Sequence, residues 1–323
     1  MVSRNFPPGT GAPRVTRDDL FRQRMAGSDR SRALPRVALV SCRALPLGDE
    51  DAPALLAACV GAGLDAEWLV WDDPAVDWTS YDLVVIRSTW DYPPRRDDFV
   101  AWADSVPRLA NPADVIRWNT DKGYLRDLEQ AGLPVVPTTW LAPGDDVVLP
   151  RSGEYVVKPA VGAGARDTAR YQPGHAELAR EHARRMLAEG REVMVQPYLA
   201  AVDEVGETGL VYFGGRFSHA VRKSALLTGP DPEVVGLYRE EEIEPAEPTA
   251  TERKVAELTL AAVPGGADRL LYARVDLVPD PDGDPIVLEV ELTEPSFFLG
   301  GAPDAADLFA ATIITTLTSR TLG

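Results

Sequence analysis

Residues 271–298, LYARVDLVPDPDGDPIVLEVELTEPSFF, decide the fold, because two apolar strands flank an Asp-Gly turn and carry carboxylates within them. Successive side chains of a strand point to opposite faces. Most apolar residues of both strands therefore share one face, and Arg274, Asp276, Glu289 and Glu291 share the other. This acidic face needs an explanation, since a core strand has no place for it.

Pairing across the turn brings the charged residues together. A turn centred on 282–283 pairs Asp276 with Glu289 and Arg274 with Glu291. Carboxylates directly opposite one another repel unless water or a cation lies between them. Oxygen ligands with open positions for phosphate oxygens suit Mg²⁺. From the hairpin alone, a magnesium site and a solvent-exposed acidic face are equally open.

The composition limits the possible functions. The chain has 323 residues, of which 45% are hydrophobic and 26% charged, and this length suits two or three packed subdomains. The net charge of −17 argues against nucleic acid or an anionic membrane as the partner. We find neither an apolar run long enough to cross a bilayer nor a secretory signal, and Cys42 and Cys59 lack metal spacing. We therefore expect a cytoplasmic protein.

Local patterns divide the chain into regions. Residues 1–35 are basic and rich in Pro, Gly and Ser, so we expect a disordered extension, with a basic docking arm as the alternative. Strand, helix, strand, strand and helix patterns over 36–118 predict an α/β sheet layer. Two hairpin patterns within 201–323 predict an antiparallel sheet, so the fold class is α/β with an α+β C-terminal half.

Apolar periodicity and capping residues predict the individual elements. We expect strands at 36–42, 66–71, 82–88, 154–160 and 192–199, and helices at 49–63, 96–106, 119–132, 175–190 and 304–320. Another helix begins at the capping box formed by Thr249 and Glu252. The acidic run 49–51 is interpreted as helix-capping, with a contact to a substrate ammonium as the alternative.

Two lysines are candidates for anion binding. Lys158 ends an apolar strand before Pro159, and a buried lysine is rare unless it is paired. Lys122 falls in the predicted first turn of a helix, where a bound anion would offset its unfavourable position in the helix dipole. A solvated Lys122 is the alternative. The glycine loop 161–167 lacks the lysine of a Walker A loop.

The segment RSTWDYP, residues 87–93, follows a predicted strand at the end where ligands bind in open α/β sheets. Arg87 has the planar fork that binds a carboxylate at two points. The remaining residues expected to shape a substrate pocket are Ser88, Trp90, Asp91 and Tyr92. An ion pair between Arg87 and Asp91 with aromatic packing is the alternative.

Together these stretches resemble ATP-grasp enzymes of the glutathione-synthetase-like group. The E-x-N-x-x-x-P pattern of that group appears at 289–295, with Glu291 in place of Asn. By this resemblance Asp276, Glu289 and Glu291 are metal ligands, for two Mg²⁺ ions, and Arg274 contacts the transferring phosphate or the substrate. The extra charge of Glu291 leaves the ion preference in doubt.

The resemblance extends over 36–323 and implies an ATP-grasp fold in three parts. These are an N-terminal α/β substrate domain over 36–118, a small lid over 119–200, and an antiparallel-sheet domain for metal and ATP over 201–323. Implied ATP-binding residues are Lys122, Lys158, Gly162, Gly164, Gln196, Pro197, Tyr198, Leu199, Glu204 and Glu207. Arg222 and Lys223 join Arg274 as catalytic candidates.

The resemblance implies an ATP-dependent ligase that joins a small carboxylate to an amine through an acyl phosphate. The stretches RSTWDYP and WNTDKGYL narrow the resemblance to a bacterial subgroup that includes the cyclo-ligase closing the cycloserine ring, so an intramolecular reaction is an option. A small-molecule kinase and a nucleotide-binding module without turnover are the alternatives, and a homodimer is left open. The lysines and carboxylates weigh against the module, because binding adenine would not need them.

Overall fold

The computed structural model describes residues 33–230, 234, 236–238 and 242–322. The chain divides into the units Met1–Leu34 and Pro35–Gly323, and the fold below belongs to the second. Nearly all of the extension expected over 1–35 lies outside the described residues. In the described part of the chain, no helix is long and apolar enough to cross a membrane.

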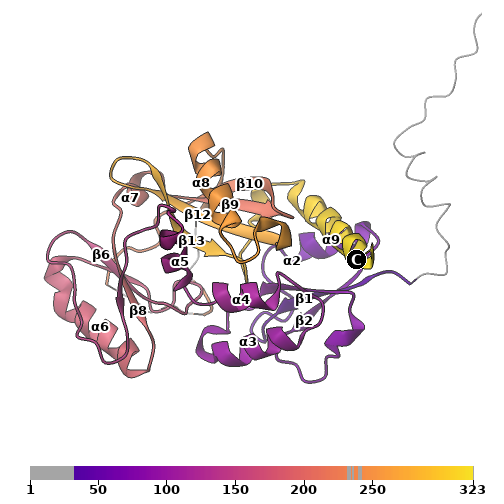
Figure 1. Cartoon of the computed structure of the whole chain (residues 1–323), viewed down its shortest axis with the longest axis horizontal. Coiled ribbons are helices and arrows are strands. Elements are labelled where there is room, and N and C mark those ends of the chain that lie inside the picture. The colour runs from indigo at the N-terminus through magenta and orange to yellow at the C-terminus, as the bar shows by residue number, and fades with distance from the viewer. Residues whose placement is uncertain (1–32, 231–233, 235, 239–241, 323) are drawn as a thin grey trace, which may run out of the picture. The chain divides into compact units, whose positions relative to one another are not determined.

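The first sheet is parallel and has the strand order β2-β1-β3-β4, of which Figure 1 labels β1 and β2. Its strands are β1 (Arg36–Ser41), β2 (Asp65–Val70), β3 (Leu83–Ser88) and β4 (Leu109–Ala110), and its helices are α2 (Ala52–Gly61) and α3 (Arg96–Ser105). The interiors of β1 and β3 are fully buried, as expected of parallel strands covered on both faces. The predicted α/β layer is therefore present, and the segment 87–93 does begin at the end of a strand.

The second sheet has the order β5-β8-β6-β7 and is antiparallel. It consists of β5 (Thr139–Leu141), β6 (Tyr155–Pro159), β7 (Ala169–Tyr171) and β8 (Val193–Pro197). Helix α6 (Ala176–Ala188) contacts β6 and β8, and the three share an apolar core (Figure 1). This sheet carries Lys158 in β6.

The third sheet has the order β11-β10-β9-β12-β13 and carries the acidic hairpin. Its strands are β9 (Glu207–Phe213), β10 (Arg216–Lys223), β11 (Ile243–Ala246), β12 (Tyr272–Pro279) and β13 (Pro285–Glu291). Asp276 pairs with Glu289 and Arg274 with Glu291, which confirms the predicted pairing at the charged end. The register then shifts, so that Leu277 pairs with Val287. The predicted pairing is wrong nearer the turn, because a bulge there leaves one residue of β13 unpaired.

Polar side chains cover the outer edge of β13. Asn119 donates to the Val290 carbonyl at 2.7 Å and accepts from the Leu292 amide at 2.8 Å. The Tyr124 hydroxyl accepts from the Val290 amide at 2.9 Å. These contacts satisfy an exposed strand edge and bring the chain around Lys122 to the charged hairpin.

The helix predicted over 119–132 is wrong as a single element. The structure has α4 (Ala113–Asn119) and α5 (Tyr124–Gln130), and Lys122 lies in the turn between them. The Lys122 amide donates to the Ala160 carbonyl at 2.9 Å, which ties this turn to the end of β6. The Asp121 carboxylate accepts from the Gly123 amide at 2.8 Å and so shapes the turn in place of a helix.

The remaining helices are α7 (Ala201–Val205), α8 (Ala250–Ala261) and α9 (Ala305–Leu322). Short 3₁₀ turns lie at Trp78–Ser80, Pro93–Arg95, Pro173–His175, Ala267–Arg269 and Leu299–Gly301. Both hydrogen bonds of the predicted capping box at Thr249 and Glu252 are present at the start of α8. Helix α9 contacts α2, β9 and β10.

Candidate functional site

A cavity of about 880 Å³ brings together residues of the second and third sheets and of the segments that follow β1 and β3 of the first sheet. Its lining includes most of the residues expected at the site: Trp90, Tyr92, Lys122, Lys158, Gly162, Gly164, Gln196, Pro197, Tyr198, Leu199, Glu207, Lys223, Arg274, Glu289 and Glu291. Six expected residues are not in the lining: Arg87, Ser88, Asp91, Glu204, Arg222 and Asp276. The volume suits a nucleotide or a drug-sized ligand.

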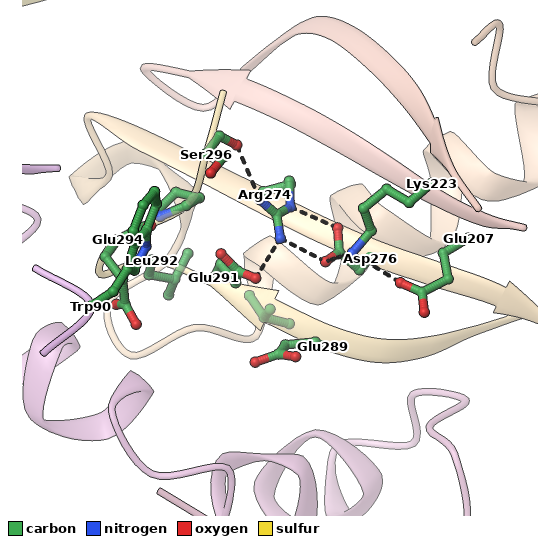
Figure 2. A network of polar contacts seen from close by, with 12 residues as sticks. Trp90, Glu207, Lys223, Arg274, Asp276, Glu289, Glu291, Leu292, Glu294 and Ser296 are labelled. Atoms are coloured by element: carbon green, nitrogen blue, oxygen red, sulfur yellow. Dashed lines mark hydrogen bonds and ion pairs between the residues drawn. The ribbon is translucent and has the colours of Figure 1, made fainter. Parts of the chain in front are cut away.

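Asp276 lies at the centre of a buried charge network beneath the cavity (Figure 2). Its carboxylate accepts from Lys223 Nζ at 2.9 Å and from Arg274 Nε and Nη2 at 2.8 and 2.9 Å. Burial alone would raise the pKa of Asp276, but Arg274 and Lys223 lower it to about 2. Lys223 also pairs with Glu207 at 2.9 Å. Asp276 is therefore ionised and holds both cations in place.

Arg274 joins the two strands of the hairpin, because its Nη2 donates to Glu291 as well as to Asp276 (Figure 2). Burial and the nearby carboxylates of Asp276 and Glu289 raise the pKa of Glu291 to about 7, although Arg274 opposes this shift. One guanidinium therefore serves two carboxylates, and Asp276 is the more strongly stabilised of the two.

Lys122 and Lys158 both face Glu289. Lys122 Nζ lies 2.9 Å from Glu289 Oε1 and donates to the Gly162 carbonyl at 2.9 Å. Burial lowers the pKa of Lys122, but the Glu289 carboxylate more than offsets this and raises it overall. Burial lowers the pKa of Lys158 to about 8, although Glu289 opposes the shift. The two lysines thus place positive charge on the wall of the cavity from separate segments.

The carboxylates fit Mg²⁺ in their chemistry. Asp276, Glu289 and Glu291 offer hard oxygen ligands from two neighbouring strands. Among the described residues, no three Asp, Glu, His or Cys side chains are arranged to hold a metal ion by themselves. Each of these three carboxylates instead contacts a cation. Phosphate oxygens would bind the same cations, so the set fits an ion that binds together with a phosphate group.

The expected adenine segment, residues 196–199, lines the cavity at the end of β8. Gln196 Nε2 donates to Thr138 Oγ1 at 2.9 Å, which fixes its side chain. The Tyr198 amide donates to the Glu154 carbonyl at 2.8 Å and so already has an acceptor. Glu204 lies on α7 and is exposed, outside the cavity lining, so the structure does not place it where a ribose contact was expected.

Alternation along β10 separates Arg222 from Lys223. Lys223 lines the cavity, whereas Arg222 points to the other face and donates to Thr208 Oγ1 at 2.7 Å. That hydroxyl donates to Glu252 of α8 at 2.6 Å. The placement of Arg222 among the catalytic residues is therefore not supported, because neighbours on a strand point to opposite faces.

The glycine loop closes one side of the cavity. Gly164 has a φ of +62°, and a Cβ there would lie 2.2 Å from the Leu237 carbonyl oxygen. Only glycine fits this conformation and this close approach. At Gly162, a Cβ would lie 3.1 Å from Pro159 Cγ. The loop thus depends on its glycines to different degrees.

Arg87 does not face the cavity. It is fully buried, its guanidinium lies 3.4 Å from the ring centroid of Phe297, and Nη2 donates to the Pro295 carbonyl at 2.8 Å. The structure contradicts the expected direct contact with a substrate carboxylate, because β3 places this side chain in the core. The alternative ion pair with Asp91 is also wrong, since Asp91 accepts from Trp71 and Arg95.

Ser88 is also fully buried and absent from the lining, so of the segment 87–93 only Trp90 and Tyr92 reach the cavity. Trp90 Nε1 donates to the Glu294 carbonyl at 2.9 Å. Burial raises the pKa of Glu294 to about 8, with a further contribution from Glu291. This end of the cavity therefore presents aromatic walls and a carboxyl group whose neutral form is favoured by burial.

Sequence reasoning missed several residues of the site. Glu294 and Ser296 line the cavity, and no local pattern distinguishes them from a loop. Gly209 pairs with Asp276, and a Cβ there would lie 3.0 Å from Asp276 Oδ1. Asp51 was expected to cap α2, but its side chain caps nothing there and accepts from the Phe297 and Leu299 amides. Local sequence patterns give no access to such contacts, because Asp51 lies 246 and 248 positions from the residues whose amides it accepts.

Comparison with known proteins identifies this architecture. A family model described as D-cycloserine synthetase DcsG, N-terminal domain, matches residues 37–111. The cycloserine biosynthesis protein DcsG of Streptomyces lavendulae is 42% identical over 281 residues, covering 82% of this chain and 93% of that protein. The crystal structure of D-cycloserine synthetase DcsG matches with a TM-score of 0.79 and 40% identity, covering 87% of this chain and 99% of that one.

A more distant structure matches the same fold. D-alanine–D-alanine ligase from Bacillus anthracis, complexed with ATP, has a TM-score of 0.61 at 14% identity and covers 90% of this chain and 100% of its own. The three sheets are accordingly those of the ATP-grasp fold, so the predicted fold and enzyme class are confirmed. Within that class, the chain belongs to the DcsG family.

Proposed function

We propose that this ATP-dependent ligase closes a ring within a small amino-acid-like substrate, joining its carboxyl carbon to a nitrogen through an acyl phosphate. The observation that carries the proposal is the meeting of Lys122, Lys158 and Arg274 with the carboxylates of the hairpin in one cavity. The name of the 42% identical relative, a cycloserine biosynthesis protein, supports the ring-closing reaction. Forming the cycloserine ring links an amino-acid carboxyl carbon to a nitrogen carried by the side-chain oxygen.

The chain's cations would hold the phosphates of ATP. Lys122 would leave Glu289 for phosphate oxygens, Lys158 would contact them from β6, and Arg274 would stabilise charge on the transferring group. Asp276, Glu289 and Glu291 would hold Mg²⁺, which when bound neutralises charge on the phosphate oxygens. Neither buried cysteine lines the cavity, and no covalent protein nucleophile is needed.

The proposed reaction proceeds by two displacements, the first of ADP and the second of phosphate. A carboxylate oxygen of the substrate attacks the γ-phosphorus, and ADP leaves. The substrate nitrogen then attacks the acyl carbon, loses a proton, and phosphate leaves with the oxygen that came from the carboxylate. Water has to be excluded because acyl phosphates hydrolyse, and the glycine loop beside Gly164 is placed to do this.

We assign a separate role to each of the three regions of the chain that carry the sheets. We propose that 36–118 binds the substrate, that 119–200 forms a lid carrying Lys158, and that 201–323 holds metal and nucleotide. Trp90, Tyr92 and Glu294 would contact the substrate, and 196–199 would contact adenine.

The experiment that tests the proposal follows oxygen from the carboxylate. Amino acids and their ureido, O-amino and peptide derivatives are screened with ATP and Mg²⁺ for phosphate release, and an active compound is then labelled with ¹⁸O in its carboxylate. We expect one ¹⁸O atom in the released phosphate and a cyclic product. A stable phosphorylated product without phosphate release would identify a kinase instead.

A further inference from the structure

The segment Thr293–Leu299 forms one wall of the cavity without pairing with any described strand. Its residues alternate: the odd-numbered ones are buried, and the even-numbered ones are partly exposed. The even-numbered side chains, Glu294, Ser296 and Phe298, all line the cavity. The segment thus presents three side chains to a ligand while its other residues anchor it in the core.

Five successive carbonyls of this segment are held by side chains from other parts of the chain. The Tyr272 hydroxyl donates to the Thr293 carbonyl at 2.9 Å, Trp90 Nε1 to the Glu294 carbonyl at 2.9 Å, and Arg87 Nη2 to the Pro295 carbonyl at 2.8 Å. Arg274 Nη1 donates to the Ser296 carbonyl at 3.0 Å, and His219 Nε2 contacts the Phe297 carbonyl at 2.7 Å. Figure 2 shows the Arg274 contact and places Trp90 beside Glu294. Side chains therefore replace the hydrogen bonds that a neighbouring strand would supply.

Asp51 completes this network from the amide side. Its carboxylate oxygens accept from the Phe297 amide at 3.0 Å and the Leu299 amide at 2.9 Å, and the residue is 8% exposed. Phe298, between those amides, has a φ of +55°, a conformation that costs a non-glycine residue free energy. The two charge-assisted hydrogen bonds to Asp51, one from the residue before Phe298 and one from the residue after it, compensate for that cost.

Arg87 holds the same segment from the end of β3. Its guanidinium stacks on Phe297 and donates to the carbonyl two residues earlier. The charges of Asp49 and Asp51 favour the charged form of Arg87, but its Nε and Nη1 have no hydrogen-bond partner among the described residues. A buried charge is costly unless it is paired, so its retention here needs a use beyond packing.

We propose that Asp51 and Arg87 are positioning residues that set substrate selectivity by fixing Thr293–Leu299, so that Glu294, Ser296 and Phe298 meet the substrate in one geometry. The inference rests on the proposed function, since it assigns this wall to the substrate. ATP would contact Lys122 and Lys158, which neither positioning residue touches. Loss of the clamp should therefore change substrate use far more than ATP binding.

The test uses Asp51→Asn in the full chain, because the amide keeps the shape but cannot accept with both of its terminal atoms. The probes are O-amino-D-serine, the open form of the cycloserine ring, and its L enantiomer. We expect kcat/KM for the preferred enantiomer to fall at least tenfold, the ratio between enantiomers to shrink, and KM for ATP to stay within twofold. Asp82→Asn is the matched control, since that carboxylate also accepts a backbone amide, from Arg36, but lies outside the cavity lining.

Amide hydrogen exchange separates this inference from the proposed function. In Asp51→Asn we expect faster exchange in a peptide covering 293–301, with 154–160 unchanged, whether or not the probes are turned over. Arg87→Lys, which keeps the charge but loses the planar fork, should give the same pattern at smaller size. The inference is overturned if exchange at 293–301 is unchanged in both variants, or if ATP and substrate kinetics change equally. An inactive wild type with selective exchange would overturn the proposed function alone.

Discussion

The two ends of the cavity are polar for different reasons. At the hairpin end, charged side chains contact one another, as Asp276 does with Lys223 and Arg274. At the substrate end, side chains such as Asp51 and Trp90 bind backbone groups of one segment. The first end has charges that phosphate and metal can take over, and the second has a fixed wall. The proposed reaction, in which a phosphoryl group passes from ATP to a rigidly held substrate, would use both.

The largest expected effect comes from the carboxylates of the hairpin. Glu289→Gln should lower turnover by about a hundredfold to a thousandfold, because the Mg²⁺ ion proposed to bind the phosphates would lose a protein ligand. Asp276→Asn should lose turnover and also about 3 kcal/mol or more of unfolding free energy, since Lys223 and Arg274 are buried and each loses one of its two carboxylate partners among the described residues. Phosphate release and thermal unfolding measure these effects, with Glu244→Gln on exposed β11 as the control. Turnover near that of the wild type in both variants would show the hairpin to be structural.

The next largest effect should separate nucleotide from substrate. Lys122→Met and Lys158→Met should each weaken binding of a non-hydrolysable ATP analogue at least tenfold, or about 1.4 kcal/mol. Calorimetric titration gives these affinities, and the exposed Lys254→Met serves as the control. Unchanged affinity in both variants would make the lysines architectural and remove the contrast between the two ends.

A smaller effect is expected at the glycine loop. Gly164→Ala should lower kcat about tenfold, because the positive φ costs 1–2 kcal/mol and the added methyl group meets the Leu237 carbonyl. Gly162→Ala is the matched comparison and should be milder, since its Cβ would meet only Pro159 at 3.1 Å. Steady-state kinetics compare kcat of the Gly164→Ala and Gly162→Ala variants. Equal effects would show that the shape of this loop is not specific to Gly164.

The last effect concerns stability away from both ends, where no loss of activity is expected. His182 on α6 is buried against the Tyr171 hydroxyl at 2.9 Å, and burial lowers its pKa to about 4. Between pH 6.5 and pH 4 the unfolded chain binds a proton that the folded chain does not, so unfolding free energy falls as pH falls, by roughly 2–3 kcal/mol. Urea unfolding across this range should show a shallower decline for His182→Gln. The same slope in both proteins would assign the loss to carboxylates instead.

The sequence predicted the hairpin end better than the substrate end. Alternation and a short turn were enough to pair Asp276 with Glu289, because the interaction is local in sequence. The exposed Glu204 and the outward-facing Arg222 show the limit of transferring roles by resemblance, since one residue of offset reverses a side chain on a strand. Arg87 was singled out correctly as unusual, but its partner lies 208 residues away and periodicity gives no access to such a contact.

The most direct test of the proposed metal and ATP site is a crystal structure with Mn²⁺ and a non-hydrolysable ATP analogue, using anomalous scattering to locate the metal. We predict an anomalous peak bound by Asp276 and Glu289 together with phosphate oxygens, with Lys122 turned from Glu289 toward the phosphates and Lys158 also contacting them. A peak bound by phosphate oxygens alone, with the ion pairs of Asp276 and Glu289 intact, would show that these carboxylates are not metal ligands.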